Sequence, residues 1–183
     1  MYYMFLADGF EEIEALGTLD LMRRAGIDVK TVTTDGDAVC GTHGIRVFAD
    51  ITEKDFAYDC CDGIILPGGM PGTENLYENE TVASAVSYCM DNNKLVACIC
   101  AAPVILGRRG YLKGINAVCF PGFENELTEA NVKSDSLCEK DGNIITAKGA
   151  GCVFEFAYAI ISFIKDSTTA KNVIDTVQYN GLK

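Results

Sequence analysis

Short apolar runs that alternate with helical patterns constrain the fold of this chain more than any other feature of its sequence. The runs are YYMFLA, DVKTVTT, CDGIILPGG, KLVACIC and NIITAKG. Runs of this kind predict parallel strands, because helices that connect parallel strands cover both faces of the sheet. The sequence therefore predicts an α/β fold with a doubly wound, mostly parallel sheet sandwiched by helices.

The stretches between these runs fit the connecting helices. Helices are predicted over 11–26, 80–93, 101–110, 152–166 and 168–180, and a small β-hairpin over 38–50, around 41–44. The segment 116–122 is predicted to end another strand. No repeat or linker interrupts the 183 residues, so one domain over 1–183 is expected.

The charge balance and the apolar pattern exclude two classes of partner. A net charge of −11 argues against nucleic acid, whose phosphates require clustered Lys and Arg. No run reaches the roughly 20 apolar residues that a membrane span needs. The N-terminus lacks the pattern of a signal peptide, so we expect a cytoplasmic protein whose nine cysteines are reduced.

Cys100 stands where a predicted strand meets a predicted helix, near the sheet edge at which such folds place their sites. Segments 7–9, 67–69, 100–101 and 149–151 are expected to converge there. A side chain on such a turn projects into the cleft as a nucleophile elbow, and the new helix N-terminus favours a thiolate. The other interpretation is a buried thiol that only packs, as most of the other cysteines are expected to do.

Glu14 is the second anomaly of the sequence. At 100° per residue, Phe10, Glu14, Gly17 and Leu21 share one helix face, which places a carboxyl within an apolar stripe. Protonated, Glu14 could donate a hydrogen bond to a thiolate, whereas its ionised form would raise the thiol pKa. The alternative is a surface glutamate on a helix of different register. Leu16 and Leu19 lie off the stripe, which favours this alternative unless they mark a second apolar side, such as a dimer contact.

The only histidine, His43, lies in the predicted hairpin. It is expected to be a turn residue within its own subunit rather than a catalytic base, although it could reach a cleft across a subunit boundary. No set of ligands has metal-site spacing, so no metal site is predicted.

Several segments resemble the ThiJ/PfpI superfamily: FLADGFEEIEA, LMRRAGI, ILPGGMPGTENL, ACICAAP and TAKGAGCVFEFAYAII. They are most similar to the branch that contains the Parkinson-disease-associated protein deglycase and its bacterial relatives. The likeness keeps the same order from Phe5 to about Phe163. It implies a flavodoxin-like sandwich that forms a homodimer and works without a cofactor.

The resemblance also implies roles for individual residues. Cys100 matches the family's reactive cysteine and Glu14 the carboxyl that contacts it. Gly68, Gly69 and Ala101 match the backbone positions on the side of the thiol that holds an oxyanion. Arg24 lies near the position of a family arginine by the pocket. His43 lies on a hairpin that in the family reaches toward the partner subunit's pocket.

The activities that the resemblance implies are glyoxalase (methylglyoxal to lactate), deglycation of early glycation adducts, and redox-dependent chaperoning. Phe120 stands where some members carry a histidine near the cysteine, which argues against a peptidase and weakens the case for an efficient glyoxalase. Three hypotheses stay open: an enzyme acting on small dicarbonyls or their adducts, a redox sensor or redox-gated chaperone whose cysteine becomes a sulfinic acid, and a binding scaffold with an inert thiol.

Overall fold

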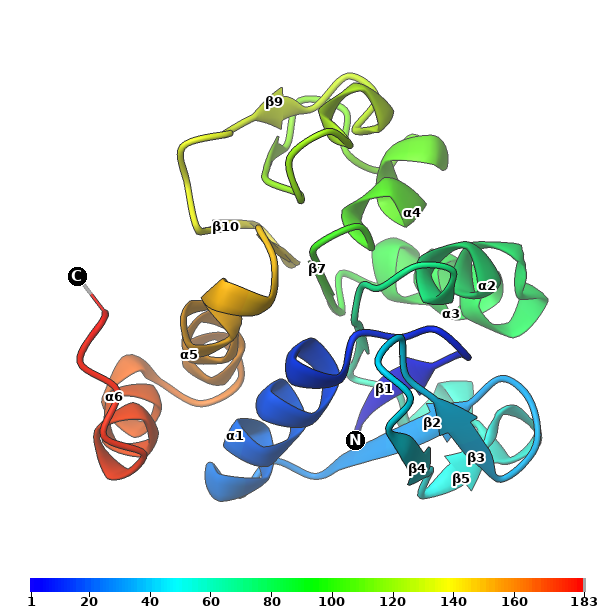
Figure 1. Cartoon of the computed structure of the whole chain (residues 1–183). Coiled ribbons are helices and arrows are strands. Elements are labelled where there is room, and N and C mark those ends of the chain that lie inside the picture. Colours follow the sequence, from blue (N-terminus) through cyan, green and yellow to red (C-terminus); the bar gives the residue numbers. More distant parts are fainter. Residues whose placement is uncertain (183) are drawn as a thin grey trace.

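The sheet predicted from the apolar runs is present in the computed structural model, which describes residues 1–182. Its strands are β1 (Tyr2–Leu6), β2 (Val29–Thr33), β5 (Ile51–Thr52), β6 (Gly63–Leu66), β7 (Leu95–Ile99), β10 (Cys138–Asp141) and β11 (Ile144–Ala147). These seven strands lie in the order β10-β11-β7-β6-β1-β2-β5 (Figure 1). All neighbours pair in parallel except β10 with β11. The predicted α/β fold is thus confirmed.

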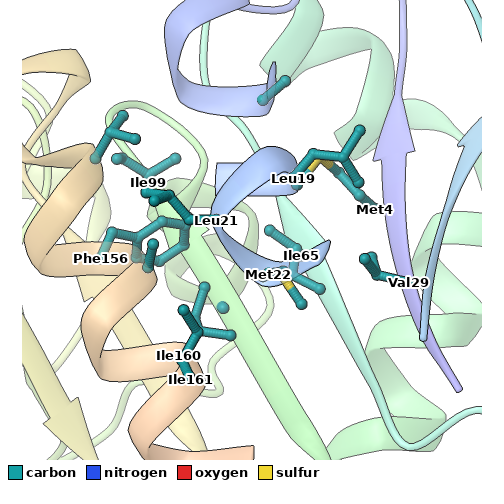
Figure 2. Packing of buried hydrophobic residues seen from close by; sticks show 14 of the residues in the cluster. Met4, Leu19, Leu21, Met22, Val29, Ile65, Ile99, Phe156, Ile160 and Ile161 are labelled. Atoms are coloured by element: carbon teal, nitrogen blue, oxygen red, sulfur yellow. The ribbon is translucent and has the colours of Figure 1, made fainter. Parts of the chain in front are cut away.

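Helices cover both faces of this sheet, and each face buries its own apolar cluster. One face carries α1 (Thr18–Arg24), α5 (Val153–Ile164) and α6 (Ser167–Thr176), and the other carries α2 (Gly72–Glu78), α3 (Glu80–Asp91) and α4 (Pro103–Arg108) (Figure 1). Figure 2 shows the first cluster, where Leu21 and Met22 of α1 lie near Phe156 and Ile160 of α5 over the sheet. These layers hold the carboxyl ends of the strands in fixed positions.

The predicted first helix differs from a regular α-helix. Its first part, Ile13–Gly17, is a π-helix, and only then does α1 begin. A π-turn contains more residues than an α-turn, so the assumed 100° per residue does not hold there. Leu19, expected on a second apolar side, is 9% exposed and packs in the core of its own subunit (Figure 2).

Three other segments test the remaining predictions. The hairpin is confirmed as β3 (Ala38–Cys40) paired with β4 (Arg46–Phe48). The strand end expected at 116–122 is only β8 (Asn116–Ala117), which pairs with β9 (Asn131–Val132) outside the main sheet. Strand β10 was not predicted, because an edge strand with the sequence CEKD lacks the apolar pattern of the buried strands. Within residues 1–182, no helix has both the length and the apolar character to cross a membrane.

Candidate active site

Cys100 occupies a strained elbow between β7 and α4. Its φ of +65° lies in the left-handed region, which residues other than glycine rarely adopt. Hydrogen bonds hold the backbone on both sides: Cys100 N donates to Ala147 O at 2.9 Å, and Phe120 N donates to Cys100 O at 2.8 Å. Such a conformation costs about 1–3 kcal/mol and clusters at functional sites. The elbow directs a partly exposed thiol to the strand ends.

Glu14 is buried beside this thiol, with 1% of its surface exposed. Its Oε2 accepts a hydrogen bond from Gly68 N at 2.9 Å. A Cβ at Gly68 would lie 2.6 Å from Cys100 Cβ and 2.7 Å from Glu14 Oε2, so only glycine lets the two side chains approach. Glu14 Oε1 is buried with no hydrogen-bond partner of standard geometry among the described residues. This free oxygen is a suitable position for a proton.

Burial raises the pKa of Glu14 to about 7, although its contacts with the Cys100 thiol and the Gly68 N–H oppose the rise. Burial also raises the pKa of Cys100 to about 12, and the charge of an ionised Glu14 adds to the effect. The expectation that a helix N-terminus favours the thiolate is outweighed, first by burial and then by the charge of an ionised Glu14. Because protonation of either group changes the pKa of the other, Glu14 and Cys100 titrate as a pair.

Backbone N–H groups surround the sulfur. Those of Gly69 and Ala101 point to Cys100 and favour its ionised form. The N–H of Gly68, predicted on the oxyanion side, instead holds the Glu14 carboxylate. Gly69 N and Ala101 N are therefore the donors available to a negative charge that develops next to the sulfur.

The four predicted segments do converge at this point. Gly72 N donates to Gly9 O at 3.2 Å, which joins the loop after β1 to the start of α2, directly after the loop that follows β6. The backbone of Ala150, in the loop after β11, lies close to the Glu14 carboxylate. Phe120 reaches the same edge and is 46% exposed. Its ring lies over Gly149, where an added Cβ would come within 3.2 Å.

Arg24 and His43 are not brought to Cys100 within the subunit. Arg24 ends α1, ten residues after Glu14, and its Nε donates to Asp20 Oδ2 at 2.7 Å. His43 has a 68% exposed side chain, and its Nδ1 lies 2.9 Å from Glu12 Oε2. The predicted roles of both residues at a partner's pocket stay predictions.

Glu12 has a role that its place in the sequence does not indicate. Its side chain is buried, with 4% of the residue exposed. Its Oε1 accepts hydrogen bonds from the N–H groups of His43 (2.7 Å) and Ile45 (3.4 Å), which attach the hairpin to the first helical segment. No local sequence pattern marks Glu12, because its burial depends on where the hairpin packs.

Known proteins resemble this chain in sequence and in fold. Protein DJ-1 homolog B of Arabidopsis thaliana is 34% identical over 158 residues, 85% of this chain, and the match spans only 36% of the plant protein. Glutathione-independent glyoxalase DJR-1.2 of Caenorhabditis elegans is 31% identical over 157 residues, 85% of this chain and 83% of the relative. The structure of Toxoplasma gondii DJ-1, described as oxidized, matches with a TM-score of 0.93 and 29% identity over 98% of both chains.

A match to a protein-family model confirms the family resemblance inferred from the sequence. The DJ-1/PfpI family model matches residues 2–163, which include Glu14, Gly68 and the Cys100 elbow. The chain belongs to the DJ-1/PfpI family.

Proposed function

We propose that this protein acts on reactive dicarbonyls or glycation adducts through the Cys100 thiol, with Glu14 as the group that carries protons. The observation that carries the proposal is the strained elbow, which holds a thiol next to a buried carboxyl and two backbone N–H donors. A relative named as a glutathione-independent glyoxalase, 31% identical, supports this reaction class. No cofactor is required in the proposed reaction.

The reactive form in this proposal is a Cys100 thiolate beside a protonated Glu14. When Glu14 holds a proton, its negative charge no longer opposes the thiolate, and its O–H becomes a donor to sulfur. The unpartnered Oε1 is the site for that proton. The N–H groups of Gly69 and Ala101 stabilise the thiolate from the other side. This tautomer provides a nucleophile without a histidine.

With methylglyoxal, the Cys100 thiolate forms a bond to the aldehyde carbon, and the carbonyl oxygen becomes an alkoxide held by Gly69 N and Ala101 N. Glu14 gives its proton to this alkoxide, which yields a hemithioacetal and leaves Glu14 ionised. Glu14 then removes the proton from the former aldehyde carbon and returns it to the neighbouring carbon, while the hydroxyl proton of the hemithioacetal moves to the former ketone oxygen, and the product is a lactoyl thioester. Water hydrolyses the thioester to lactate and restores the thiol, so methylglyoxal and water yield lactic acid.

The test is lactate formation from methylglyoxal by the wild type, Cys100→Ser and a matched control, Cys60→Ser, whose thiol is exposed elsewhere. We expect turnover in the wild type and the control and its loss in Cys100→Ser. If wild type and Cys100→Ser consume methylglyoxal at the same slow rate and no lactate forms, the enzymatic proposal fails.

A second candidate function is a redox sensor or redox-gated chaperone. His43 is engaged by Glu12 and does not reach Cys100 within the subunit, and a sensor needs no such base. Two equivalents of peroxide would each transfer one oxygen to Cys100, forming a sulfinic acid and two water molecules. Mild peroxide should then add two oxygens at Cys100 alone. Earlier oxidation of the exposed Cys40 or Cys60 would contradict this function.

The proposal includes a homodimer in a reducing, cytoplasmic compartment. Three large apolar side chains of the hairpin and the first helical segment are exposed: Ile13 (60%), Ile45 (52%) and Phe48 (82%). Ile45 and Ile13 lie close to the same residue, because Ile45 N donates to Glu12 Oε1 and Ile13 follows Glu12. All nine cysteines are free thiols, as expected in a reducing compartment. Light scattering of the wild type and Ile13→Glu tests the dimer, and equal masses would contradict this interface.

A further inference from the structure

A second cluster of reactive groups lies on the hairpin side of the first helical segment, apart from the Cys100 thiol. Glu11, Glu12 and His43 each offer one ligand atom, and these atoms lie within 4.8 Å of one another. The cluster combines an imidazole with two carboxylates from segments about 30 residues apart in the chain. The Cys100 chemistry does not use it.

The burial of the two carboxylates is unusual for adjacent like charges. The side chains of Glu11 and Glu12 are only 14% and 5% exposed. Within residues 1–182, His43 is the only basic side chain within 4.0 Å of either carboxylate. Buried carboxylates are costly unless a cation or a hydrogen-bond donor faces them. One imidazole compensates two negative charges incompletely, which leaves this position attractive to a cation.

Each carboxylate divides its two oxygens between the backbone and the cluster. Glu11 Oε2 accepts a hydrogen bond from Glu14 N at 2.7 Å, while Oε1 lies 4.0 Å from His43 Nδ1. Glu12 Oε1 accepts from the N–H groups of the hairpin, while Oε2 lies 2.9 Å from the same Nδ1. The outer hydrogen bonds fix both carboxylates, so one oxygen of each stays directed at the imidazole.

We propose that Glu11, Glu12 and His43 bind one divalent first-row transition-metal ion per chain, with Zn²⁺ as the best-fitting ion. Tetrahedral Zn²⁺ with bonds of about 2.0–2.2 Å places its ligand atoms about 3.4 Å apart. The distances from His43 Nδ1 to Glu12 Oε2 (2.9 Å) and to Glu11 Oε1 (4.0 Å) lie on either side of this value. A histidine nitrogen with two carboxylate oxygens favours Zn²⁺ over Ca²⁺ and Mg²⁺, which prefer oxygen ligands alone.

Within the single chain His43 is 68% exposed, which leaves a fourth coordination position open on that side of the cluster. Bound metal would join the hairpin to the first helical segment through metal–ligand bonds in place of the direct contact between Glu12 and His43. The hairpin would then be tied to the segment that carries Glu14 more firmly than by hydrogen bonds alone. The ion therefore stabilises the folded chain by mass action.

The test uses the full chain freed of metal with a chelator. Zn²⁺ is titrated against a competing chromophoric chelator, and Co²⁺ is added separately as a spectroscopic probe. We expect one Zn²⁺ per chain and a higher unfolding temperature with Zn²⁺. The Co²⁺ complex should show tetrahedral d–d absorption without thiolate-to-cobalt charge transfer, which distinguishes this site from the cysteines.

His43→Ala and Glu11→Gln should each weaken Zn²⁺ binding at least about tenfold and remove the Zn²⁺-dependent rise in unfolding temperature. Arg46→Ala, an exposed change in the same hairpin, and Cys100→Ala should bind as the wild type does. The proposal is overturned if the wild type takes up no stoichiometric Zn²⁺, if His43→Ala binds it equally well, or if Co²⁺ shows thiolate charge transfer.

Discussion

Glu12 and Glu14 are two carboxyls of one short segment with nearly equal burial, at 4% and 1% exposed, yet they differ in their preferred charge. At Glu12, burial favours the neutral form, but hydrogen bonds from His43 and from backbone N–H groups lower the pKa below its ordinary value. At Glu14, which lies deeper in the protein, burial outweighs the opposing hydrogen bonds, and the pKa rises to about 7. A low exposed fraction alone does not decide the charge of a carboxyl.

The difference shows how one helical segment serves two purposes. The ionised Glu12 accepts hydrogen bonds and holds the hairpin. Among residues 1–182, one oxygen of Glu14 has no hydrogen-bond partner of standard geometry, so Glu14 can exchange a proton with the neighbouring Cys100. A structural carboxylate has its acceptor positions filled, and a carboxylate suited to proton transfer has one left free.

The largest effect is expected from Glu14→Gln, which removes the proton carrier but keeps the size of the side chain. Turnover of methylglyoxal should fall about 100-fold or more, since a general acid–base group contributes about 10²–10⁴-fold. Alkylation of Cys100 should lose its inflection near the Glu14 pKa of about 7 and rise only at higher pH. Peptide-mapped iodoacetamide rates from pH 5 to 10 measure this. The exposed Glu78→Gln is the control.

An unchanged inflection near pH 7 in Glu14→Gln would show that Cys100 does not titrate as a pair with Glu14. A slow and flat rate in the wild type would show an inert thiol, and both proposed functions would then be abandoned.

The second-largest effect is the pH dependence that Glu14 gives to the free energy of unfolding. The folded-state pKa of Glu14 is raised from 4.5 to about 7. The contribution of the protonated Glu14 to the free energy of unfolding is therefore fully present below pH 4.5 and is lost as pH rises through 7. These pKa values differ by about 2.5 pH units, and each corresponds to about 1.36 kcal/mol per proton. The stability of the wild type relative to Glu14→Gln should therefore fall by about 3 kcal/mol between pH 4.5 and 8. Urea unfolding of both proteins across this range measures it, and a constant difference would contradict the raised pKa.

Glu12→Ala should destabilise the protein by about 2 kcal/mol at pH 7, because hydrogen bonds to a charged acceptor contribute about 1.5–3 kcal/mol. The pH trend should be opposite to that of Glu14. A lowered pKa gives stability that is present above the ordinary value of 4.5 and is lost as pH falls through the folded-state value. Urea midpoints at pH 7 and pH 4 measure both, with Glu78→Ala as control. A loss below about 0.5 kcal/mol would place Glu12 among ordinary surface residues.

The contrast between these two carboxyls also marks the limit of sequence reasoning. The apolar runs predicted the sheet, and the strand-to-helix junction predicted the Cys100 elbow, because both depend on local pattern. Glu14 was singled out by an α-helical period that does not apply in the π-helix Ile13–Gly17. The contact between Glu12 and His43 joins residues 31 positions apart and depends on where the hairpin packs, which no local pattern encodes.

The smallest effect is expected from His43→Ala, because the imidazole is exposed and can be replaced by water. Its hydrogen bond with Glu12 raises the pKa of His43 above 6.5, so the stability that it adds is fully present below pH 6.5 and is lost as pH rises through the folded-state value. In metal-free buffer, His43→Ala should therefore lower the unfolding temperature slightly at pH 6 and less at pH 9. NMR titration of the single histidine in wild type and Glu12→Gln measures the same coupling directly. If the pKa of His43 does not fall in Glu12→Gln, the two side chains are not coupled. The backbone N–H groups alone would then compensate the buried Glu12 carboxylate.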